Sequence, residues 1–157
     1  MKRWKADIRQ AVLSDLDLVE KISKTAISEI YPRYYPRGAV GFFLGHRSKT
    51  NIAEDIKQKQ VFLCFDLKER IAGTITIKGN EICRLFVLPE FQGKGYGTQM
   101  LDFAENMIFQ KHRRCELAAS LPAKSLYLER GYKEAEYHTL LTENQDYLCY
   151  DIMIKEG

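Results

Sequence analysis

The sequence predicts an α/β fold of the α+β kind, in which helices cover both faces of a central, mixed and mostly antiparallel sheet. Three observations predict it. Hydrophobic residues recur at helical spacing in the first third of the chain and again after residue 98. Short apolar or alternating runs separated by turn residues lie between these regions, as in antiparallel hairpins. A strand–helix–strand pattern follows, so the sheet is expected to be mixed.

One strand and three helices are expected in the first part of the chain. Residues 7–10 predict a short first strand, and residues 14–29 carry hydrophobic side chains at helical spacing. The segment 31–37 follows, and its two prolines end the helix and force an extended or turning backbone. Residues 39–47 and 51–58 predict two short helices, because their apolar side chains are again in helical phase.

Three strands are expected next. Residues 61–65 form a short, wholly apolar run, as in a buried strand. Residues 71–77 alternate between two sets of side chains, and a Gly79-Asn80 turn joins them to a strand at 81–87. The turn indicates that these last two strands form an antiparallel hairpin.

The C-terminal half alternates between helices and strands. From Thr98 onward hydrophobic residues return to a period of 3.6, which predicts a helix. Residues 114–119 predict a strand, 123–130 a helix, and 132–138 and 147–154 two final strands. In chain order the predicted elements are β α α β β β α β α β β.

Composition and charge are those of an ordinary globular protein. The 157 residues are 45% hydrophobic and 29% charged, which excludes a disordered or collagen-like chain. The length is typical of one domain, so residues 1–157 are expected to form a single domain. The net charge of +3 is too small to argue for nucleic acid. No apolar run approaches the roughly 18 residues that a membrane span needs.

The N-terminus, the cysteines and the histidines point to a cytoplasmic protein without a metal. Basic residues at the N-terminus are followed by no apolar stretch, so no signal peptide is expected. The four cysteines lie far apart without a C-x-x-C pair and are expected to be reduced thiols. His46, His112 and His138 lack metal-ligand spacing, so no metal site is expected.

The most informative stretch is the glycine-rich turn in residues 85–98, which runs from a strand into the start of a helix. Gly93, Gly95 and Gly97 remove side chains where the backbone must approach a ligand. The helix start adds unpaired N–H groups and partial positive charge, so the turn suits a pyrophosphate. Its glycine spacing fits neither the Walker A loop nor the G-x-G-x-x-G fingerprint. A turn that merely joins strand and helix is the alternative.

Two motifs resemble those of the GNAT superfamily of N-acetyltransferases. The acyl-coenzyme A signature of that family resembles Val87-x-Pro89-x-x-Gln92-x-x-Gly95-x-Gly97. A second family stretch resembles Ala123-x-x-x-Tyr127-x-x-x-Gly131-Tyr132. The resemblance covers roughly residues 6–154 and is strongest in 81–132. One departure is Ser120, because the family often has asparagine there.

The resemblance implies a GNAT-like fold and an N-acetyltransferase that uses acetyl-coenzyme A, without a metal. The pantetheine is expected to pair with the backbone of Phe86 and Val87, and the pyrophosphate to lie on the N–H groups of residues 92–98. Lys94 and Lys124 are expected to add charge at the phosphates, unless they are ordinary solvated lysines. The residues expected to bind this cosubstrate are Phe86, Val87, Gln92, Gly93, Lys94, Gly95, Tyr96, Gly97, Thr98, Ser120 and Lys124.

The resemblance also implies residues for the chemistry. Tyr127 is expected to hydrogen-bond or protonate the leaving thiolate, and a backbone N–H near Val87 to stabilise the oxyanion. An amine of pKa about 10.4 is neutral in only about one molecule in a thousand at neutral pH, so a general base is useful. Glu81 is the candidate base, with a chain of water molecules as the alternative. Tyr31, Tyr34 and Tyr35 are expected to wall the acceptor cleft, unless their loop packs its rings on the domain.

The predicted function is transfer of an acetyl group to a primary amine, of a small molecule or a peptide, by direct attack in a ternary complex. A coenzyme A-binding sensor or interaction module without turnover is the alternative. Transfer through Cys83 or Cys149 is less favoured, because neither has a histidine in a pairing motif. The protein is expected to be a cytoplasmic monomer or homodimer that binds neither nucleic acid nor membrane. The sequence does not identify the acceptor amine.

Overall fold

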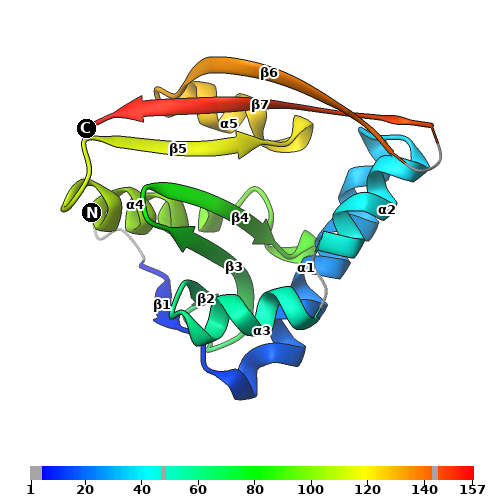
Figure 1. Cartoon of the computed structure of the whole chain (residues 1–157). Helices are drawn as coiled ribbons and strands as arrows, with labels where there is room; N and C mark the ends of the chain where they lie inside the picture. The colour runs from blue at the N-terminus through cyan, green and yellow to red at the C-terminus, as the bar shows by residue number, and fades with distance from the viewer. Residues whose placement is uncertain (1–4, 47–48, 143–144) are drawn as a thin grey trace.

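The computed structural model describes residues 5–46, 49–142 and 145–157, which form one sheet flanked by helices (Figure 1). The strands are β1 (Asp7–Gln10), β2 (Val61–Phe65), β3 (Ile71–Lys78), β4 (Glu81–Val87), β5 (Arg114–Ala119), β6 (Lys133–Leu141) and β7 (Tyr147–Glu156). The α-helices are α1 (Leu16–Ile30), α2 (Arg37–His46), α3 (Lys49–Lys57), α4 (Tyr96–Phe109) and α5 (Lys124–Glu129). Short 3-10 turns precede α1 and α5, follow α1, and lie between β4 and α4.

The sheet is mixed and mostly antiparallel, as predicted. Its strands lie in the order β1-β2-β3-β4-β5-β7-β6. Neighbouring strands are antiparallel except for β4 and β5, which are parallel. In Figure 1 the strands β1–β4 lie below and β5–β7 lie above, with the parallel pair at the boundary.

The structure has three helices before β2, as the predicted ranges have, whereas the predicted order β α α β β β α β α β β counts only two. Proline has no N–H to donate and its ring obstructs a continuing helix. Helix α1 therefore ends at Ile30, and α2 begins only after Pro36. The two short helices predicted at 39–47 and 51–58 are both present, as α2 and α3.

Two further boundaries differ from prediction for physical reasons. Helix α4 begins at Tyr96 and not at Thr98, because the left-handed Gly95 (φ 94°) ends the turn and the Tyr96 ring is buried. Strand β6 continues beyond the predicted end at residue 138 to Leu141. Pairing with β7 holds it there, and because nearly every residue of β6 is exposed, hydrophobic alternation could not reveal its length.

Helices cover both faces of the sheet, and a hydrophobic cluster lies under each group. Side chains of β2 alternate between the clusters, as expected for a strand buried on both faces. Phe62 and Cys64 join the cluster that includes residues of α4 and α5. Val61 and Leu63 join the cluster that includes residues of α1, α2 and α3. The predicted arrangement of helices is thus confirmed.

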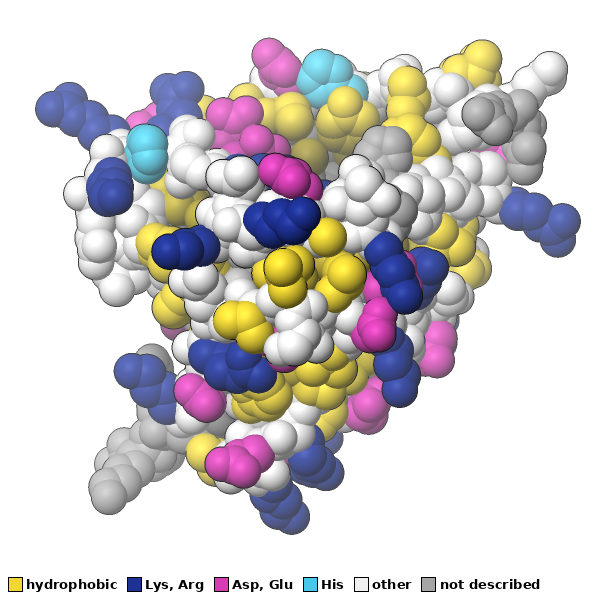
Figure 2. All heavy atoms as spheres, turned by 60° about the horizontal axis from the view of Figure 1, so that its bottom comes forward, with side chains coloured by type: hydrophobic (Ala, Val, Ile, Leu, Met, Phe, Trp, Pro, Cys, Tyr) yellow, Lys and Arg dark blue, Asp and Glu magenta, His cyan; other side chains and the backbone are white. Residues whose placement is uncertain are grey.

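The outer surface mixes charges of both signs. Figure 2 shows acidic and basic side chains next to one another on the face at the bottom of Figure 1, with hydrophobic side chains between them. Ion pairs of β1, α1 and α3 contribute to this mixture, among them Lys49–Asp17 at 3.0 Å. This face therefore presents interspersed charges rather than a field of one sign.

In the described ranges, none of the helices has the length and hydropathy to cross a membrane.

Candidate active site

Strands β4 and β5 are paired at one end and separated at the other. Their register joins Glu81 to Glu116 and Ile82 to Leu117. Beyond these positions β4 continues along β3 and β5 continues along β7, and the two strands run apart in Figure 1. The backbone edge of residues 83–87 therefore faces the separation and is not paired with a described strand.

The backbone at Val87 points into this separation. The Leu88 N–H donates to the carbonyl of Ala72 on the β3 side at 2.8 Å. Successive backbone groups of a strand point to opposite sides, so the N–H and carbonyl of Val87 point away from β3. The carbonyl accepts a hydrogen bond from Gln92 Nε2 at 3.1 Å, which braces the following turn against the end of the strand.

The glycine-rich turn contains two glycines in the left-handed region. Gly93 has φ 73° and Gly95 has φ 94°, values that residues with a Cβ rarely adopt. A Cβ on Gly93 would meet nothing within 4 Å, so the backbone conformation, and not close packing, requires glycine there. Helix α4 starts directly afterwards, and its first N–H groups have no partner within the helix. Such a helix start stabilises an anion.

Two cations lie beside this turn over the ring of Phe91. Lys94 Nζ is 5.8 Å and the Arg70 guanidinium carbon 5.4 Å from the ring centroid. Tyr96 packs against the same ring edge-on, with a centroid distance of 5.4 Å. A ring face attracts cations, so Phe91 holds positive charge next to the turn. Arg70 also pairs with Asp66 at 2.7 Å and was not predicted from the sequence.

A cavity of about 320 Å³, here called the glycine-turn cavity, lies against the turn and the open edge of β4. Tyr31 and Tyr34 form part of its wall on the α1 side. The predicted cosubstrate residues that line it are Phe86, Val87, Gln92, Gly93, Gly95, Tyr96, Gly97, Thr98 and Ser120.

Lys94 and Lys124 do not line this cavity. Lys124 Nζ lies 2.9 Å from the carboxylates of both Glu134 and Asp151. Hydrogen bonds to Glu134 and Asp151 raise the pKa of Lys124 and keep it charged. Its role at a phosphate stays a prediction, and Lys124 would have to leave two ion pairs to fill it.

A second cavity, of about 370 Å³, lies between α2 and the β6–β7 hairpin and is called the hairpin cavity. Both predicted catalytic residues, Glu81 and Tyr127, line it. It shares part of its wall with the glycine-turn cavity, namely Tyr31, Leu85, Phe86, Ser120 and Ala123. The two cavities therefore meet where β4 and β5 separate.

Tyr127 is buried on the wall of the hairpin cavity, four residues after Ala123 of the shared wall. Its ring lies edge-on to that of Tyr132, with a centroid distance of 5.6 Å. Burial, followed by the nearby Tyr31 and Cys115, raises the pKa of Tyr127 well above its usual value. Among the residues that the structure describes, none hydrogen-bonds the Tyr127 hydroxyl. The hydroxyl is therefore protonated at neutral pH and able to donate to a ligand.

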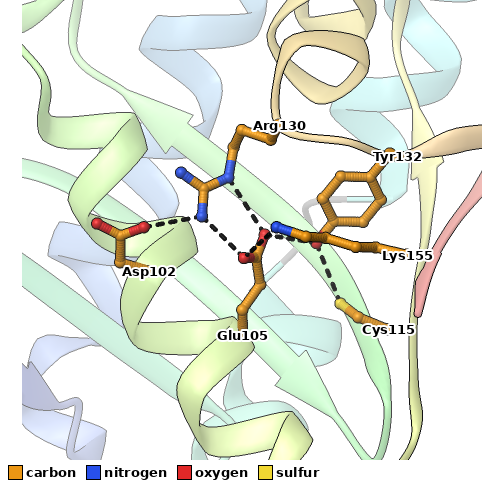
Figure 3. A network of polar contacts seen from close by, with 6 residues as sticks. All are labelled: Asp102, Glu105, Cys115, Arg130, Tyr132 and Lys155. Carbon is orange, nitrogen blue, oxygen red and sulfur yellow. Dashed lines mark hydrogen bonds and ion pairs between the residues drawn. The ribbon is translucent and has the colours of Figure 1, made fainter. Parts of the chain in front are cut away.

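A polar network fixes the end of α5, the helix that carries Tyr127 (Figure 3). Glu105 of α4 accepts hydrogen bonds from Arg130 Nη2 (2.8 Å), Tyr132 Oη (2.9 Å) and Lys155 Nζ (2.9 Å). Burial alone would raise the pKa of Glu105, but these three donors lower it below its usual value. The Tyr132 N–H donates to the Tyr127 carbonyl at 3.0 Å. The network thus joins α4 and β7 to Tyr132, whose backbone and ring both contact Tyr127.

Glu81 and Cys83 lie on β4 in the hairpin cavity. Partial burial, followed by repulsion from Glu116, raises the pKa of Glu81 above its usual value. Burial raises the pKa of Cys83 to about 11, so its thiol stays protonated. A nucleophilic cysteine needs its thiolate form, which argues against transfer through Cys83. The side chain of Cys149 lies outside the described residues.

The three tyrosines predicted to wall an acceptor cleft do not lie on one wall. Tyr31 is buried and borders both cavities. Tyr34 is half-exposed and lines only the glycine-turn cavity of the two. Tyr35 is buried, and its hydroxyl accepts a hydrogen bond from the Leu121 N–H at 2.6 Å. Tyr35 therefore packs its ring on the domain, which was the alternative expected for this loop.

Several side chains of the hairpin cavity were missed from the sequence, namely Phe42, Phe43, Arg84, Leu140 and Tyr150. The two phenylalanines are ordinary members of the apolar face of a helix, so their sequence context gives no functional signal. Arg84 did have a signal, because it interrupts the apolar pattern of β4. In the structure it pairs with the buried Asp55 of α3.

Among the described residues, no group of three His, Cys, Asp or Glu side chains is placed to hold a metal ion.

Solved structures share the fold over nearly the whole chain. A GCN5-related N-acetyltransferase from Rhodopseudomonas palustris is 20% identical with a TM-score of 0.88, covering 100% of this chain and 99% of its own. The PaiA N-acetyltransferase of Thermoplasma acidophilum, solved with coenzyme A, is 21% identical with a TM-score of 0.75, covering 98% and 99%. The spermidine/spermine N-acetyltransferase SpeG of Vibrio cholerae is 17% identical with a TM-score of 0.66, covering 97% and 92%.

The family comparison agrees with the fold. No curated protein matches the chain. The family model described as an acetyltransferase (GNAT) domain matches residues 31–141, which include the glycine-rich turn, the separated strands and Tyr127. The protein is therefore an acyltransferase and belongs to the GNAT acetyltransferase family.

Proposed function

We propose that the protein transfers an acetyl group from acetyl-coenzyme A to a primary amine, by direct attack while both substrates are bound. The observation that carries the proposal is the junction of two cavities where β4 and β5 separate. A ligand in each cavity can reach the other at the shared wall of Phe86 and Ser120. Direct transfer needs such a junction, because the reacting atoms must come within about 3–3.5 Å of each other.

The glycine-turn cavity is the proposed site of acetyl-coenzyme A. The open edge of β4 suits the amides of the pantetheine arm, since an extended ligand can pair with an exposed strand edge. The turn and the start of α4 suit the pyrophosphate. The PaiA protein of similar fold was solved with coenzyme A, which supports this cosubstrate. The Val87 N–H is the proposed donor to the oxyanion, and the Ser120 hydroxyl a proposed donor to the ligand.

Tyr127 is proposed to stabilise the leaving thiolate. A free thiol has a pKa of about 8.5 and an ordinary tyrosine about 10, and burial raises that of Tyr127 further. Complete proton transfer from Tyr127 to the sulfur is therefore unfavourable. A hydrogen bond from its hydroxyl to the developing negative charge is favourable, and this charge exists only as the carbon–sulfur bond breaks.

Glu81 is proposed to accept the proton of the attacking amine, directly or through water. Producing the neutral form of an amine with a pKa of about 10.4 costs about 4 kcal/mol at neutral pH. The raised pKa of Glu81 makes it a better base than an ordinary carboxylate. Its place on the wall of the hairpin cavity supports this role.

The hairpin cavity is the proposed acceptor site, for the primary amine of a small molecule or a peptide. The similar SpeG protein is named a spermidine/spermine N-acetyltransferase, which supports an amine acceptor. We propose that residues 1–157 act as one domain, in the cytoplasm, as a monomer or homodimer that binds neither nucleic acid nor membrane.

Two measurements test the proposal. Calorimetric titration with acetyl-coenzyme A is expected to give saturable binding with a Kd of roughly 1–100 μM, within the usual range of substrate affinities. Thiol release is then followed with a panel of primary amines. A chain that binds coenzyme A but turns over no amine would favour the non-catalytic alternative. A chain that does not bind coenzyme A would contradict both.

A further inference from the structure

We propose that the acceptor is a monoamine with an aromatic or similarly apolar body, and not a polyamine. This inference rests on the proposed function, because it assigns the acceptor of that reaction to the hairpin cavity. The walls of the cavity, its charges and the rigidity of its rings all favour such an acceptor.

The walls of the hairpin cavity are mainly apolar and come from two elements that face each other. Helix α2 contributes Phe42 and Phe43, and the β6–β7 hairpin contributes Leu140 and Tyr150. The end of β6 and the start of β7 lie beside α2 in Figure 1, and the Asp146 carboxylate just before β7 accepts a hydrogen bond from the N–H of Gly38 at 2.8 Å. This bond holds the two walls together at one end.

The charges of the cavity suit one ammonium group. Glu81 is the single carboxylate among the described residues that line it, and Arg84 the single cation. Arg84 pairs with Asp55, which also binds Lys78 at 2.9 Å, so this cluster carries a net charge of +1 if all three are ionised. A polyamine would place a second ammonium group near this positive cluster, without a second lining carboxylate. Burial of an ammonium without a counter-charge is strongly unfavourable.

The rings of the cavity are held in place before a ligand binds. Phe43 contacts Tyr31 edge-on with a centroid distance of 4.7 Å. Tyr150 stacks on His138 with a centroid distance of 5.2 Å and an angle of 17° between the ring planes. Rings that are already packed lose little freedom when they bind a flat apolar group. A volume of about 370 Å³ lies at the small end of ligand pockets and suits one ring on a short alkyl arm.

The arrangement also places the amine for the proposed reaction. An aromatic body between α2 and the hairpin leaves its amino group to reach Glu81 and Tyr127, which line the same cavity. The amine nitrogen forms a bond to the acetyl carbon as the carbon–sulfur bond breaks. The ammonium proton goes to Glu81 or to water, and the second proton that the nitrogen loses goes to the departing coenzyme A thiolate, which leaves as its thiol, or to water.

The experiment compares kcat/KM for 2-phenylethylamine, propylamine and spermidine by thiol release. The ring of 2-phenylethylamine is expected to raise kcat/KM about tenfold or more over propylamine, from aromatic contact and apolar burial. Spermidine is expected to be the poorest of the three. Faster turnover of spermidine than of 2-phenylethylamine, or equal rates for 2-phenylethylamine and propylamine, would overturn the inference. So would coenzyme A binding without turnover of any of these amines.

A charge introduced into the wall sharpens the test. Phe42→Glu adds a second carboxylate to the cavity at a half-buried position, so it is expected to move the ratio of kcat/KM for spermidine over 2-phenylethylamine upward by about tenfold or more. Leu67→Glu, at an exposed position in the β2–β3 turn, is the control and is expected to leave the ratio unchanged. An unchanged ratio in a folded Phe42→Glu protein would overturn the inference. Calorimetry with acetyl-coenzyme A on each variant, together with thiol release from a wider panel of primary amines, separates this result from failure of the proposed function, in which binding or the turnover of every amine would be lost.

Discussion

The glycine-turn cavity and the hairpin cavity are close to each other but are built in different ways. The first takes most of its proposed contacts from residues 85–98, which are adjacent in the sequence. The second takes its walls from α2, β4, β5, α5 and the β6–β7 hairpin, which are far apart in the sequence. A site made from consecutive backbone groups leaves a local signature, whereas a site made from assembled side chains leaves none.

The physical requirements of the two cavities explain this difference. Gly93 and Gly95 have left-handed backbone conformations, and the helix start must follow directly, so residue type and spacing are constrained. In the hairpin cavity a side chain needs only suitable size and polarity, which many residues satisfy. We therefore expect substitutions in the turn to act on cosubstrate binding, substitutions in the hairpin cavity to act on the acceptor, and those at the junction to act on turnover.

The largest effect is expected from the network that supports the junction. Glu105→Gln removes the carboxylate shared by Arg130, Tyr132 and Lys155 and leaves two partly buried cations without their full partner. Such a loss costs about 3 kcal/mol, or a fall in Tm of roughly 6–12 °C for a chain of this size. Thermal unfolding followed by circular dichroism measures it. Glu129→Gln, the same change at an exposed position on α5, is the control.

The pH dependence of Glu105 gives an independent check. Its folded-state pKa lies below the unfolded value, so its contribution is fully present above the unfolded pKa, about 4.3. The contribution is lost as pH falls through the folded-state pKa. The Tm difference between wild type and Glu105→Gln is therefore expected to shrink in acid. A difference that stays constant from neutral pH to about pH 3 would contradict this account.

The next largest effect is expected at Tyr127, which lines the hairpin cavity next to the wall that the two cavities share. Tyr127→Phe keeps the ring contact with Tyr132 and removes only the hydroxyl. Loss of one donor to a developing charge lowers kcat by about a hundredfold, while the Kd for acetyl-coenzyme A is expected to stay within about twofold. Steady-state kinetics and calorimetry give the two numbers. Tyr147→Phe, at an exposed tyrosine, is the control, and equal kcat values in both variants would remove Tyr127 from the chemistry.

Buried elements could be predicted from the sequence because burial imposes periodicity. Strands β2 and β4 begin and end at the predicted residues, since most of their side chains pack into one of the two clusters. The end of β6 could not be predicted, because pairing with β7 and not burial holds that exposed strand. The start of α4 was predicted too late in the chain, at Thr98. Gly97 is typical of a loop, although it lies in the helix.

Contacts between distant residues account for what could not be predicted at the candidate site. No sequence pattern around Tyr35 indicates that its ring packs in the interior. Leu121, whose N–H donates to the Tyr35 hydroxyl, is 86 positions away. Lys124 is held by Asp151 of β7, a strand whose position relative to α5 is set only by the whole fold. The assembly of Phe42 with Leu140 in one cavity depends in the same way on how α2 meets the hairpin.

A smaller effect is expected in the glycine-rich turn. Gly93→Asp places a negative charge beside the proposed pyrophosphate site and is expected to weaken binding of acetyl-coenzyme A by about tenfold. Gly79→Asp is a closely matched control, because both glycines have positive φ values, 73° and 59°, and open space around a Cβ. The two variants therefore share the backbone strain and differ in location. Equal loss of affinity in calorimetry would place the phosphate site elsewhere.

The smallest effect is expected at Glu81, since water can replace a general base. Glu81→Gln is expected to lower kcat/KM by about fivefold, with the greatest loss below neutral pH, where free amine is scarce. Its raised folded-state pKa means that its ionisation opposes folding as pH rises through that value. The variant is therefore not expected to be less stable at pH 7, and a loss of rate cannot be attributed to unfolding.

Glu116 provides the decisive comparison for this role, because its carboxylate raises the pKa of Glu81. Glu81 must be ionised to accept a proton, so kcat/KM falls as pH decreases through its pKa. Glu116→Gln keeps Glu81 and lowers that pKa, so the acidic limb of the kcat/KM profile is expected to move to lower pH with little change in the maximum. Glu81→Gln should instead remove this limb and leave only the ionisation of the amine itself. If the limb lies at the same pH in wild type and both variants, the proton leaves through water, and the hairpin cavity contributes shape to catalysis but no base.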